Sequence, residues 1–149
     1  HALWALGQLA RKNPTVVATI TAQLADADDE VRAQAAKLTG DAGNGAAAPK
    51  LVERLADPSA RVRFFAAQSL GKLKHKPAVP ALFDALKANK DEDPFLRHAC
   101  VAALTRIGDA DSVAARSTDA SPAVRMAVVL VQRRLNDRRV TLIGESTRE

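Results

Sequence analysis

Four stretches of the 149-residue chain share one pattern, and this pattern decides the fold. They are Asp26-Ala-Asp-Asp-Glu-Val-Arg32, Asp57-Pro-Ser-Ala-Arg-Val-Arg63, Asp91-Glu-Asp-Pro-Phe-Leu-Arg97 and Asp119-Ala-Ser-Pro-Ala-Val-Arg125. Each stretch has Asp first, Asp or Ser third, an aliphatic residue sixth and Arg seventh, and the arginines are 31, 34 and 28 residues apart. Self-similarity at such a period is typical of repeat proteins.

The residues around each stretch predict a helical hairpin. The third residue of each block is a good helix N-cap, because its side chain can accept a backbone N–H bond of the first turn. These residues are Asp28, Ser59, Asp93 and Ser121. After each arginine, apolar residues recur at helical spacing. This first helix is predicted to end near Gly43, Lys74, Gly108 or Asn136, and a second, shorter helix is predicted at residues 14–25, 46–56, 77–89 and 110–117.

A single hairpin cannot bury both of its apolar faces, so neighbouring hairpins must stack into a continuous core. The chain is therefore predicted to be all-α: one domain, residues 1–149, forming an α-solenoid with a right-handed superhelix of about four and a half hairpins. The predicted units are residues 1–25, 26–56, 57–90, 91–118 and 119–143, followed by a tail at 144–149. Residues 1–12 match the second half of a first helix, so we expect a fragment of a longer array. Residues 140–144 are interpreted as a truncated second helix.

The composition agrees with helices and excludes several classes of protein. The chain is 47% apolar, with no tyrosine and one tryptophan, and its Ala, Leu and Val favour helix over sheet. The lone cysteine, Cys100, excludes a disulfide framework. No apolar run reaches the roughly 20 residues that span a bilayer. The net charge of +5 is spread along the chain, and the cellular compartment is left open.

The four blocks resemble HEAT repeats of the short variety, also called PBS-lyase-like HEAT repeats. Ala66-Ala-Gln-Ser-Leu-Gly71 and Ala78-Val-Pro-Ala-Leu82 carry the same resemblance, which covers residues 1–140. In that family, the recurrent Asp and Arg form a ladder between adjacent repeats. The resemblance therefore implies a stacking role for Asp26, Asp57, Asp91, Asp119, Arg32, Arg63, Arg97 and Arg125. Such partly buried pairs fix geometry more reliably than they add net stability.

The chain is also similar, in three phrases, to the HEAT segment of large secreted bacterial dehydrogenase-like proteins. The phrases are His1-Ala-Leu-Trp-Ala-Leu6, Val62-Arg-Phe-Phe-Ala-Ala67 and Leu96-Arg-His-Ala-Cys100. Those proteins carry a sugar-dehydrogenase-type propeller before the repeats and a c-type haem domain after them. This likeness implies that the chain is a spacer between the functional domains of a periplasmic or secreted protein. If the parent protein is not of this kind, we expect a cytoplasmic location. Haem attachment needs Cys-x-x-Cys-His, and this chain has only Cys100.

No constellation of residues predicts catalysis. His98 and Cys100 lie two residues apart on a predicted helix and so point about 200° from each other, which prevents them from sharing a metal ion. The acidic clusters at residues 26–30 and 91–93 lie at helix N-termini, where the helix dipole favours negative charge. The sequence is therefore predicted to lack catalytic, cofactor and metal sites. The chain itself is expected not to be an enzyme, and whether its parent protein is one stays open.

The best candidate for a binding site is the surface of the second helices, which generally line the concave face of a HEAT array. Its charged residues are Lys50, Glu53, Arg54, Asp84, Lys87 and Arg116. This mixture of signs favours a protein-binding groove, because a nucleic-acid surface needs a basic stripe with little acid in it. The chain is predicted to be a non-catalytic scaffold or protein–protein interaction module. The alternatives are the spacer role and nucleic-acid binding through a basic edge at Lys72, Lys74 and Lys76 with the C-terminal arginines.

Overall fold

The computed structural model describes residues 14–146, with side chains between 15 and 136, and in this range it contains helices and no strand. The first helices of the hairpins are α3 (Asp29–Asp41), α5 (Ala60–Lys72), α7 (Pro94–Ile107) and α9 (Pro122–Ser146). The second helices are α2 (Pro14–Ala22), α4 (Ala48–Arg54), α6 (Val79–Asn89) and α8 (Ala110–Ala114). Short 3-10 turns are η1 (Gln23–Ala25), η2 (Gly45–Ala47) and η3 (Lys76–Ala78). The half-helix predicted for residues 1–12 lies outside the described residues.

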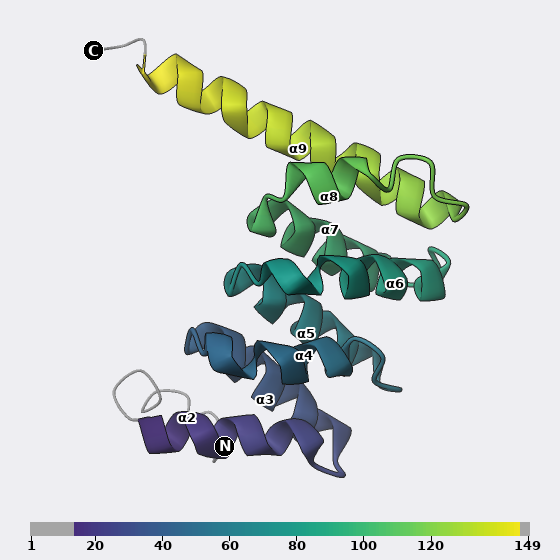
Figure 1. The fold of residues 1–149 in the computed structure, drawn as a ribbon. Coiled ribbons are helices and arrows are strands. Elements are labelled where there is room, and N and C mark those ends of the chain that lie inside the picture. Colours follow the sequence, from purple (N-terminus) through teal and green to yellow (C-terminus); the bar gives the residue numbers. More distant parts are fainter. Residues whose placement is uncertain (1–13, 147–149) are drawn as a thin grey trace.

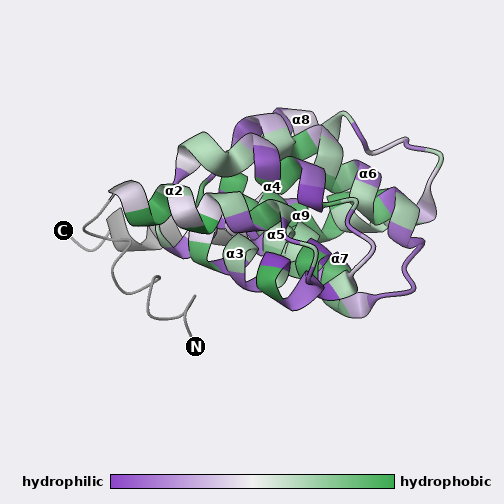
Figure 2. Cartoon of the chain, turned by 90° about the horizontal axis from the view of Figure 1, so that it is seen from below, coloured by the Kyte–Doolittle hydropathy of each residue, from purple (hydrophilic) through white to green (hydrophobic). Residues whose placement is uncertain are grey.

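The helices form two layers that run along the stack (Figure 1). In one layer α3, α5, α7 and α9 follow one another, and each packs on the next. In the other layer are α2, α4, α6 and α8; α4 packs on α5, and α6 lies against both α7 and α9. Figure 2, which views the stack from its lower end, shows the two layers one above the other. This arrangement confirms the predicted all-α solenoid of stacked helical hairpins.

Local sequence signals set most helix ends. Oδ1 of Asp28 accepts hydrogen bonds from two backbone N–H groups of the first turn of α3, at 2.8 and 3.2 Å. Asp93 caps α7 in the same way, so two of the predicted N-caps are confirmed. Ser59 precedes α5 but makes no side-chain capping bond. The residues with positive φ just after the first helices are Gly43, Lys74 and Gly108, where the sequence predicted the ends.

Small residues let the first helices approach one another closely. A Cβ added at Gly40 would collide with the side chain of Ser69, and one added at Gly71 would lie 2.7 Å from Cα of Ala103. The buried hydroxyl of Ser69 donates a hydrogen bond of 2.8 Å to the carbonyl of Ala36 in the preceding repeat. The fully buried side chains of the core include Leu51, Leu70, Leu82, Phe83, Leu86 and Leu104. Burial of this apolar surface is the main stabilising contribution.

The last helix differs from the prediction. α9 runs for 25 residues from Pro122 to Ser146, so the expected end near Asn136 and the separate second helix at residues 140–144 are wrong. No Gly or Pro occurs between residues 123 and 143, and one Asn is a weak helix breaker. Among residues 14–146, no helix combines the length and the hydropathy needed to cross a membrane.

Candidate functional site

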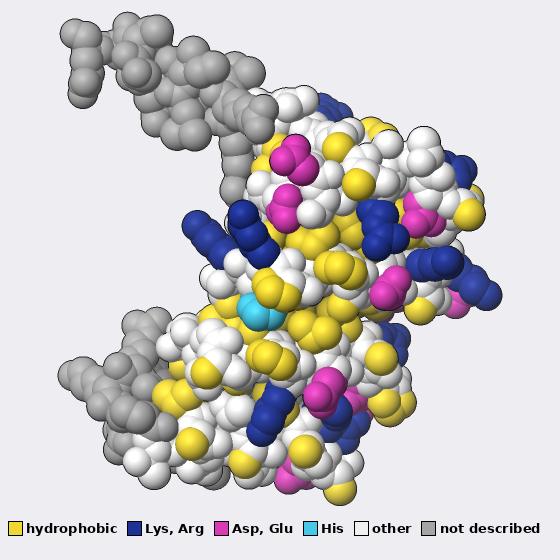
Figure 3. Space-filling view, viewed as in Figure 1, with side chains coloured by type: hydrophobic (Ala, Val, Ile, Leu, Met, Phe, Trp, Pro, Cys, Tyr) yellow, Lys and Arg dark blue, Asp and Glu magenta, His cyan; other side chains and the backbone are white. Residues whose placement is uncertain are grey.

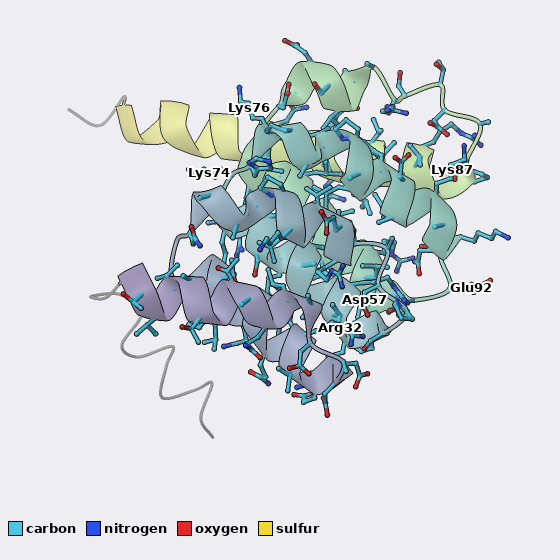
Figure 4. All side chains as sticks on the ribbon, turned by 60° about the horizontal axis from the view of Figure 1, so that its bottom comes forward. Arg32, Asp57, Lys74, Lys76, Lys87 and Glu92 are labelled. Carbon is cyan, nitrogen blue, oxygen red and sulfur yellow. The ribbon has the colours of Figure 1, made fainter. Side chains whose placement is uncertain are left out.

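Among the described residues, the most buried ion pair lies at the junction of α3 and α5, where Arg32 and Asp57 face each other (Figure 4). Nε and Nη2 of Arg32 donate to the two carboxylate oxygens of Asp57 at 2.9 and 3.0 Å. Nη1 of the same arginine donates to the backbone carbonyls of Asp26 and Ala27, both at 2.9 Å. The side chain of Asp57 is only 1% exposed. This bidentate pair therefore connects two repeats in an almost dry site.

Hydrogen bonds and charges keep both members of this pair ionised. Burial acts to raise the pKa of Asp57, but bonds from Arg32 and from the backbone N–H of Ser59, with the charges of Arg32 and Arg54, hold that pKa below its usual value. Conversely, the pKa of Arg32 is raised, chiefly by its hydrogen bond to Asp57. Arg54 contributes a longer contact, with Nη1 3.4 Å from Oδ2 of Asp57.

The aspartates that open the four blocks adopt two different local structures. In Asp26, Asp57 and Asp119, Oδ1 accepts the backbone N–H two residues ahead, at 2.9, 3.0 and 2.9 Å. Asp91 differs: it has a positive φ of 67°, and its Oδ1 lies 2.6 Å from Nη1 of Arg97 in its own unit. Three blocks thus begin with the same Asx turn, and the third block along the chain does not.

The arginines that close the blocks also differ in what they reach. Nη1 of Arg63 donates to two backbone carbonyls of its own turn at 2.8 and 2.9 Å, and Nη1 of Arg125 does the same at 2.8 and 3.0 Å. Arg97 pairs with Asp91 of its own unit. Of the four arginines assigned to an inter-repeat ladder, only Arg32 forms an ion pair with the next repeat, within the described part of the chain.

The length of α6 explains this difference. α4 ends three residues before Asp57, whereas α6 continues to Asn89. One period of 31 residues after Asp57 therefore falls on Ala88, which is still inside α6. Asp91 comes three residues later, on the turn beyond the helix, where it meets Arg97. When the repeats are aligned by this period, an exposed alanine corresponds to the buried carboxylate of Asp57.

The next junction along the stack, between α5 and α7, is called the second junction. A cavity of about 420 Å³ lies there. Its apolar walls include Leu55, Ala88 and Leu96, and Arg63 and Glu92 are among its polar lining residues. The sequence prediction missed this cavity. The signal for it was the spacing of 34 residues between Arg63 and the next block arginine, against 31 at the preceding junction.

The predicted second-helix surface carries both signs of charge with hydrophobic side chains between them (Figure 3). The predicted residues on it are Lys50, Glu53, Arg54, Asp84, Lys87 and Arg116. Arg54 and Arg116 are half-buried, and each contacts the aspartate three residues further on, at 3.4 and 3.6 Å. The guanidinium of Arg116 also lies 5.8 Å from the ring centre of Phe83. The other four residues are exposed, so they could contact a partner without breaking a buried interaction.

Between α6 and α8, the same surface has a hollow of about 480 Å³. Pro77, Val79 and Pro80 form apolar walls, and Lys76 and Arg116 place two positive charges among the lining residues. Lys76 acts on its neighbourhood electrostatically. The pKa of Asp109 lies below its usual value chiefly because Ser112 donates hydrogen bonds to it, with a further contribution from the charge of Lys76.

The basic edge considered for nucleic acid is partly neutralised. Nζ of Lys72 lies 2.5 Å from Oδ1 of Asp41, which also contacts Lys37. Lys74 and Lys76 are exposed and lie at the opposite end of the second helices from Lys87 (Figure 4). The arginines at 138, 139 and 148 lie outside the residues whose side chains are described. Of the C-terminal arginines with described side chains, Arg133 is exposed and Arg134 is half-buried, and in the described part of the chain Lys74 and Lys76 form no ion pair.

Cys100 is fully buried, and burial raises the pKa of its thiol to about 12. This side chain is therefore an uncharged core residue, while His98 is exposed. Across the described residues, no group of three or more His, Cys, Asp or Glu side chains is placed to hold a metal ion.

The sequence prediction also missed an aromatic patch on the first-helix layer. Phe64 and Phe65 pack edge to face with ring centres 5.2 Å apart, and Phe95 is 74% exposed beside them. They border a hollow of about 330 Å³. Arg61 lies 5.6 Å from the ring centre of Phe65 and pairs with Glu30 at 3.0 Å. Phe64 and Phe65 are both half-buried and pack against the core, so the exposed ring of this patch is that of Phe95.

Comparison with known families shows that this chain belongs to the HEAT-repeat family: the family model for HEAT repeats matches residues 1–63 and 48–115. A phycocyanobilin lyase subunit alpha from Picosynechococcus sp. is 37% identical over 89 residues, which are 55% of this chain and 33% of that protein. A deoxyhypusine hydroxylase-B from Oryza sativa subsp. japonica is 42% identical over 77 residues, which are 52% of this chain and 25% of that protein. The chain thus spans between a quarter and a third of these curated relatives.

A solved structure extends the likeness to the whole repeat array. The complex of CpcE and CpcF of phycocyanin lyase from Nostoc sp. PCC7120 contains a chain that matches 93% of this one with a TM-score of 0.72 and 29% identity. The match covers 59% of that chain. The PBS-lyase-like variety of HEAT repeat inferred from the block residues is therefore confirmed.

These names correct one prediction. The absence of a catalytic constellation led us to expect a protein that is not an enzyme. The relatives that share its repeats are named lyase subunits, and the structural neighbour is part of a phycocyanin lyase, which contradicts that expectation. That expectation was wrong because it depended on nucleophile, acid–base and metal motifs, whereas the similarity to the lyase relatives lies in the repeats.

Proposed function

We propose that this chain is the HEAT-repeat part of a bilin lyase that works together with a second protein chain. The observation that carries the proposal is the match of 93% of the chain to a subunit of the CpcE–CpcF complex. A stacked HEAT array offers an extended surface on which a partner and a bound chromophore can be held in a fixed relation. The described residues would supply binding and orientation.

The hollow between α6 and α8 supports a bilin-binding role. A bilin is an open-chain tetrapyrrole with a largely apolar body and propionate carboxylates. Pro77, Val79 and Pro80 offer apolar contact, while Lys76 and Arg116 offer positive charge. Charge-assisted hydrogen bonds to carboxylates are among the stronger polar contacts in proteins. In this proposal the two cations orient the bilin by its propionates.

The described part of the chain would not form a covalent bond to the bilin through its cysteine. Cys100 is fully buried, and its pKa of about 12 leaves it as a neutral thiol at physiological pH. Only the thiolate is an effective nucleophile. The residues of the hollow would therefore act by holding the bilin and by limiting its conformations.

Titration of the purified chain with phycocyanobilin, followed by absorption and fluorescence, tests this proposal. We expect a saturable spectral change, and we expect the double variant Lys76→Gln and Arg116→Gln to bind about tenfold more weakly. Lys50→Gln is the matched control, because it removes one exposed charge from α4 on the same surface. A spectral change that does not saturate, or equal binding by all variants, contradicts the proposal.

The spacer role in a haem-linked dehydrogenase-like protein and nucleic-acid binding stay predictions. Lys72 is already paired with Asp41, which weakens the case for a basic stripe. A steep fall in nucleic-acid affinity between about 50 and 200 mM salt would support that alternative. A flat response would remove it.

A further inference from the structure

We propose that the cavity at the second junction docks one acidic side chain of a protein partner, an aspartate presented in a turn, with Arg63 as its anchor. This inference deepens the partner-binding part of the proposed function and rests on it. It does not depend on bilin binding, and its test uses a different ligand and a different readout.

The first junction shows how these repeats bind a carboxylate. Nη1 of Arg32 is fixed by two backbone carbonyls of its own turn, both at 2.9 Å. The remaining edge of the guanidinium, Nε and Nη2, then receives both oxygens of Asp57. That aspartate sits in an Asx turn closed by the N–H of Ser59 at 3.0 Å. The structure itself thus contains an arginine-to-turn-aspartate interface between repeats.

At the second junction, backbone carbonyls hold the guanidinium of Arg63 in the same way. Its Nη1 donates to the carbonyls of Asp57 and Pro58 at 2.8 and 2.9 Å, which reproduces the fixation of Arg32. Within the described residues, every hydrogen bond of Arg63 runs through Nη1. Arg63 also lines the cavity of about 420 Å³. By the repeat relation to Arg32, we expect its Nε and Nη2 edge to face this cavity.

The second junction has no carboxylate at the position equivalent to Asp57. The residue one period after Asp57 is Ala88, whose side chain lines the same cavity. The block aspartate of that repeat, Asp91, is held 2.6 Å from Arg97 instead. The second junction therefore keeps the arginine and its two carbonyl contacts but has a methyl group at the carboxylate position.

The other lining residues define the ligand. Leu55, Ala85 and Leu96 offer apolar contact for the short stem of an acidic side chain. Asn89 is engaged elsewhere, because its side chain both donates to and accepts from the backbone of Asp93. Asp57 and Glu92 place two carboxylates in the lining. That of Asp57 is already paired with Arg32, and the charge of Glu92 disfavours a dianion such as phosphate more strongly than a single carboxylate.

Nuclear magnetic resonance of the side-chain Nε–Hε group of Arg63 tests the proposal directly. The probe is the blocked peptide acetyl-Leu-Ala-Asp-Pro-Ser-Ala-amide, which copies the turn bound by Arg32, and its matched control has Asn in place of Asp. We expect the Asp peptide to shift the Arg63 signal in a saturable way and the Asn peptide to have little effect. The charge-assisted bidentate bond is the physical reason.

Variants assign the binding to this cavity. Arg63→Gln should weaken peptide binding at least tenfold, and Glu92→Gln should strengthen it about two- to fivefold by removing a like charge. Arg125→Gln is the matched control, because Arg125 makes the same two carbonyl contacts in the last described repeat. This control shows what loss of those contacts does by itself, and a melting curve of each variant verifies folding.

Three outcomes would overturn the proposal. The first is an Arg63 signal that stays unmoved by the Asp peptide at high millimolar concentration. The second is equal binding by the Asn peptide or by Arg63→Gln. The third is half-saturation by sodium acetate at the same concentration as by the peptide, because the apolar walls would then contribute nothing to a peptide ligand. Failure of the bilin titration leaves these results unaffected.

Discussion

The two junctions on either side of α5 are built from the same sequence block, yet only the first is closed by an ion pair. At the first, Arg32 reaches Asp57 across the repeats with two hydrogen bonds. At the second, Arg63 makes the same contacts to its own turn, but Ala88 stands at the position of the acidic partner, and a cavity remains. Because α6 is longer than α4, the arginine of the second junction is left without the acidic partner that the arginine of the first junction has.

Both junctions nevertheless share the close contact between first helices. Gly40 lies against Ser69 at the first, and Gly71 lies against Ala103 at the second. The stack is therefore held by helix–helix packing at every step, while the ion pair is an addition at one step.

Removal of the buried carboxylate of Asp57 should lower the stability of the fold more than any other change proposed here. Asp57→Ala leaves Arg32 without its partner in a nearly dry site and breaks the Asx turn to Ser59. We expect the melting temperature to fall by about 5 to 10 °C. Asp91→Ala is the matched control, because its ion pair with Arg97 is far more exposed, and it should lower the melting temperature by about 2 °C or less. Equal shifts in calorimetry would mean that the two junctions are energetically alike.

A methyl group added between α5 and α7 should cause the second-largest loss of stability. Gly71→Ala places a Cβ 2.7 Å from Cα of Ala103, and because backbone cannot move aside cheaply, α5 and α7 must separate. Overpacking of this kind costs about 1 to 3 kcal/mol. The control is Gly45→Ala, where no atom lies within 4 Å of the added Cβ. Urea unfolding of both variants measures the difference, and a Gly71→Ala protein as stable as Gly45→Ala would contradict the packing model.

Installing a carboxylate at the second junction should make it resemble the first. In Ala88→Asp, the new side chain enters the cavity lined by Arg63, and we expect a melting temperature about 1 to 3 °C higher. The gain should vanish in an Arg63→Gln background, as a double-mutant cycle would measure. The same variant should no longer bind the Asp peptide, because its own carboxylate occupies the site. A gain that persists without Arg63 would show that the carboxylate acts elsewhere.

Acid should weaken the first junction, because its ion pair depends on the ionised carboxylate of Asp57. The pKa of Asp57 in the folded chain lies below its ordinary value of 3.8, so its ionised form contributes stability that is complete above about pH 4 and is lost as the pH falls through the lower folded-state pKa. Between about pH 4 and pH 2, the melting temperature of the parent chain should therefore fall more steeply than that of Asp57→Asn. The depressed pKa values of Asp41 and Asp109 contribute equally to both proteins. Parallel curves would mean that Asp57 titrates as an ordinary carboxyl group.

Much of the fold was predictable because its signals are local. The block pattern located the first helices, Asp28 and Asp93 were identified as N-caps from their place in the block, and Gly43 and Gly108 as helix ends. The prediction failed at Asn136, because one Asn without Gly or Pro does not stop a helix that packs on three others. The prediction that the chain is not an enzyme failed because the similarity to lyases lies in the repeats and not in a catalytic motif.

The sequence by itself determined that this chain is a stack of helical hairpins, because capping, helical periodicity and repetition act over a few residues at a time. Only the tertiary structure decided which arginine meets which aspartate, where the cavity and the two hollows lie, and that Phe95 stays exposed. Those features depend on the end of each helix relative to its neighbour in the next repeat. The sequence shows the three-residue shift as a spacing of 34 instead of 31, but only the packing of α6 on its neighbours shows that this shift leaves Arg63 without an acidic partner.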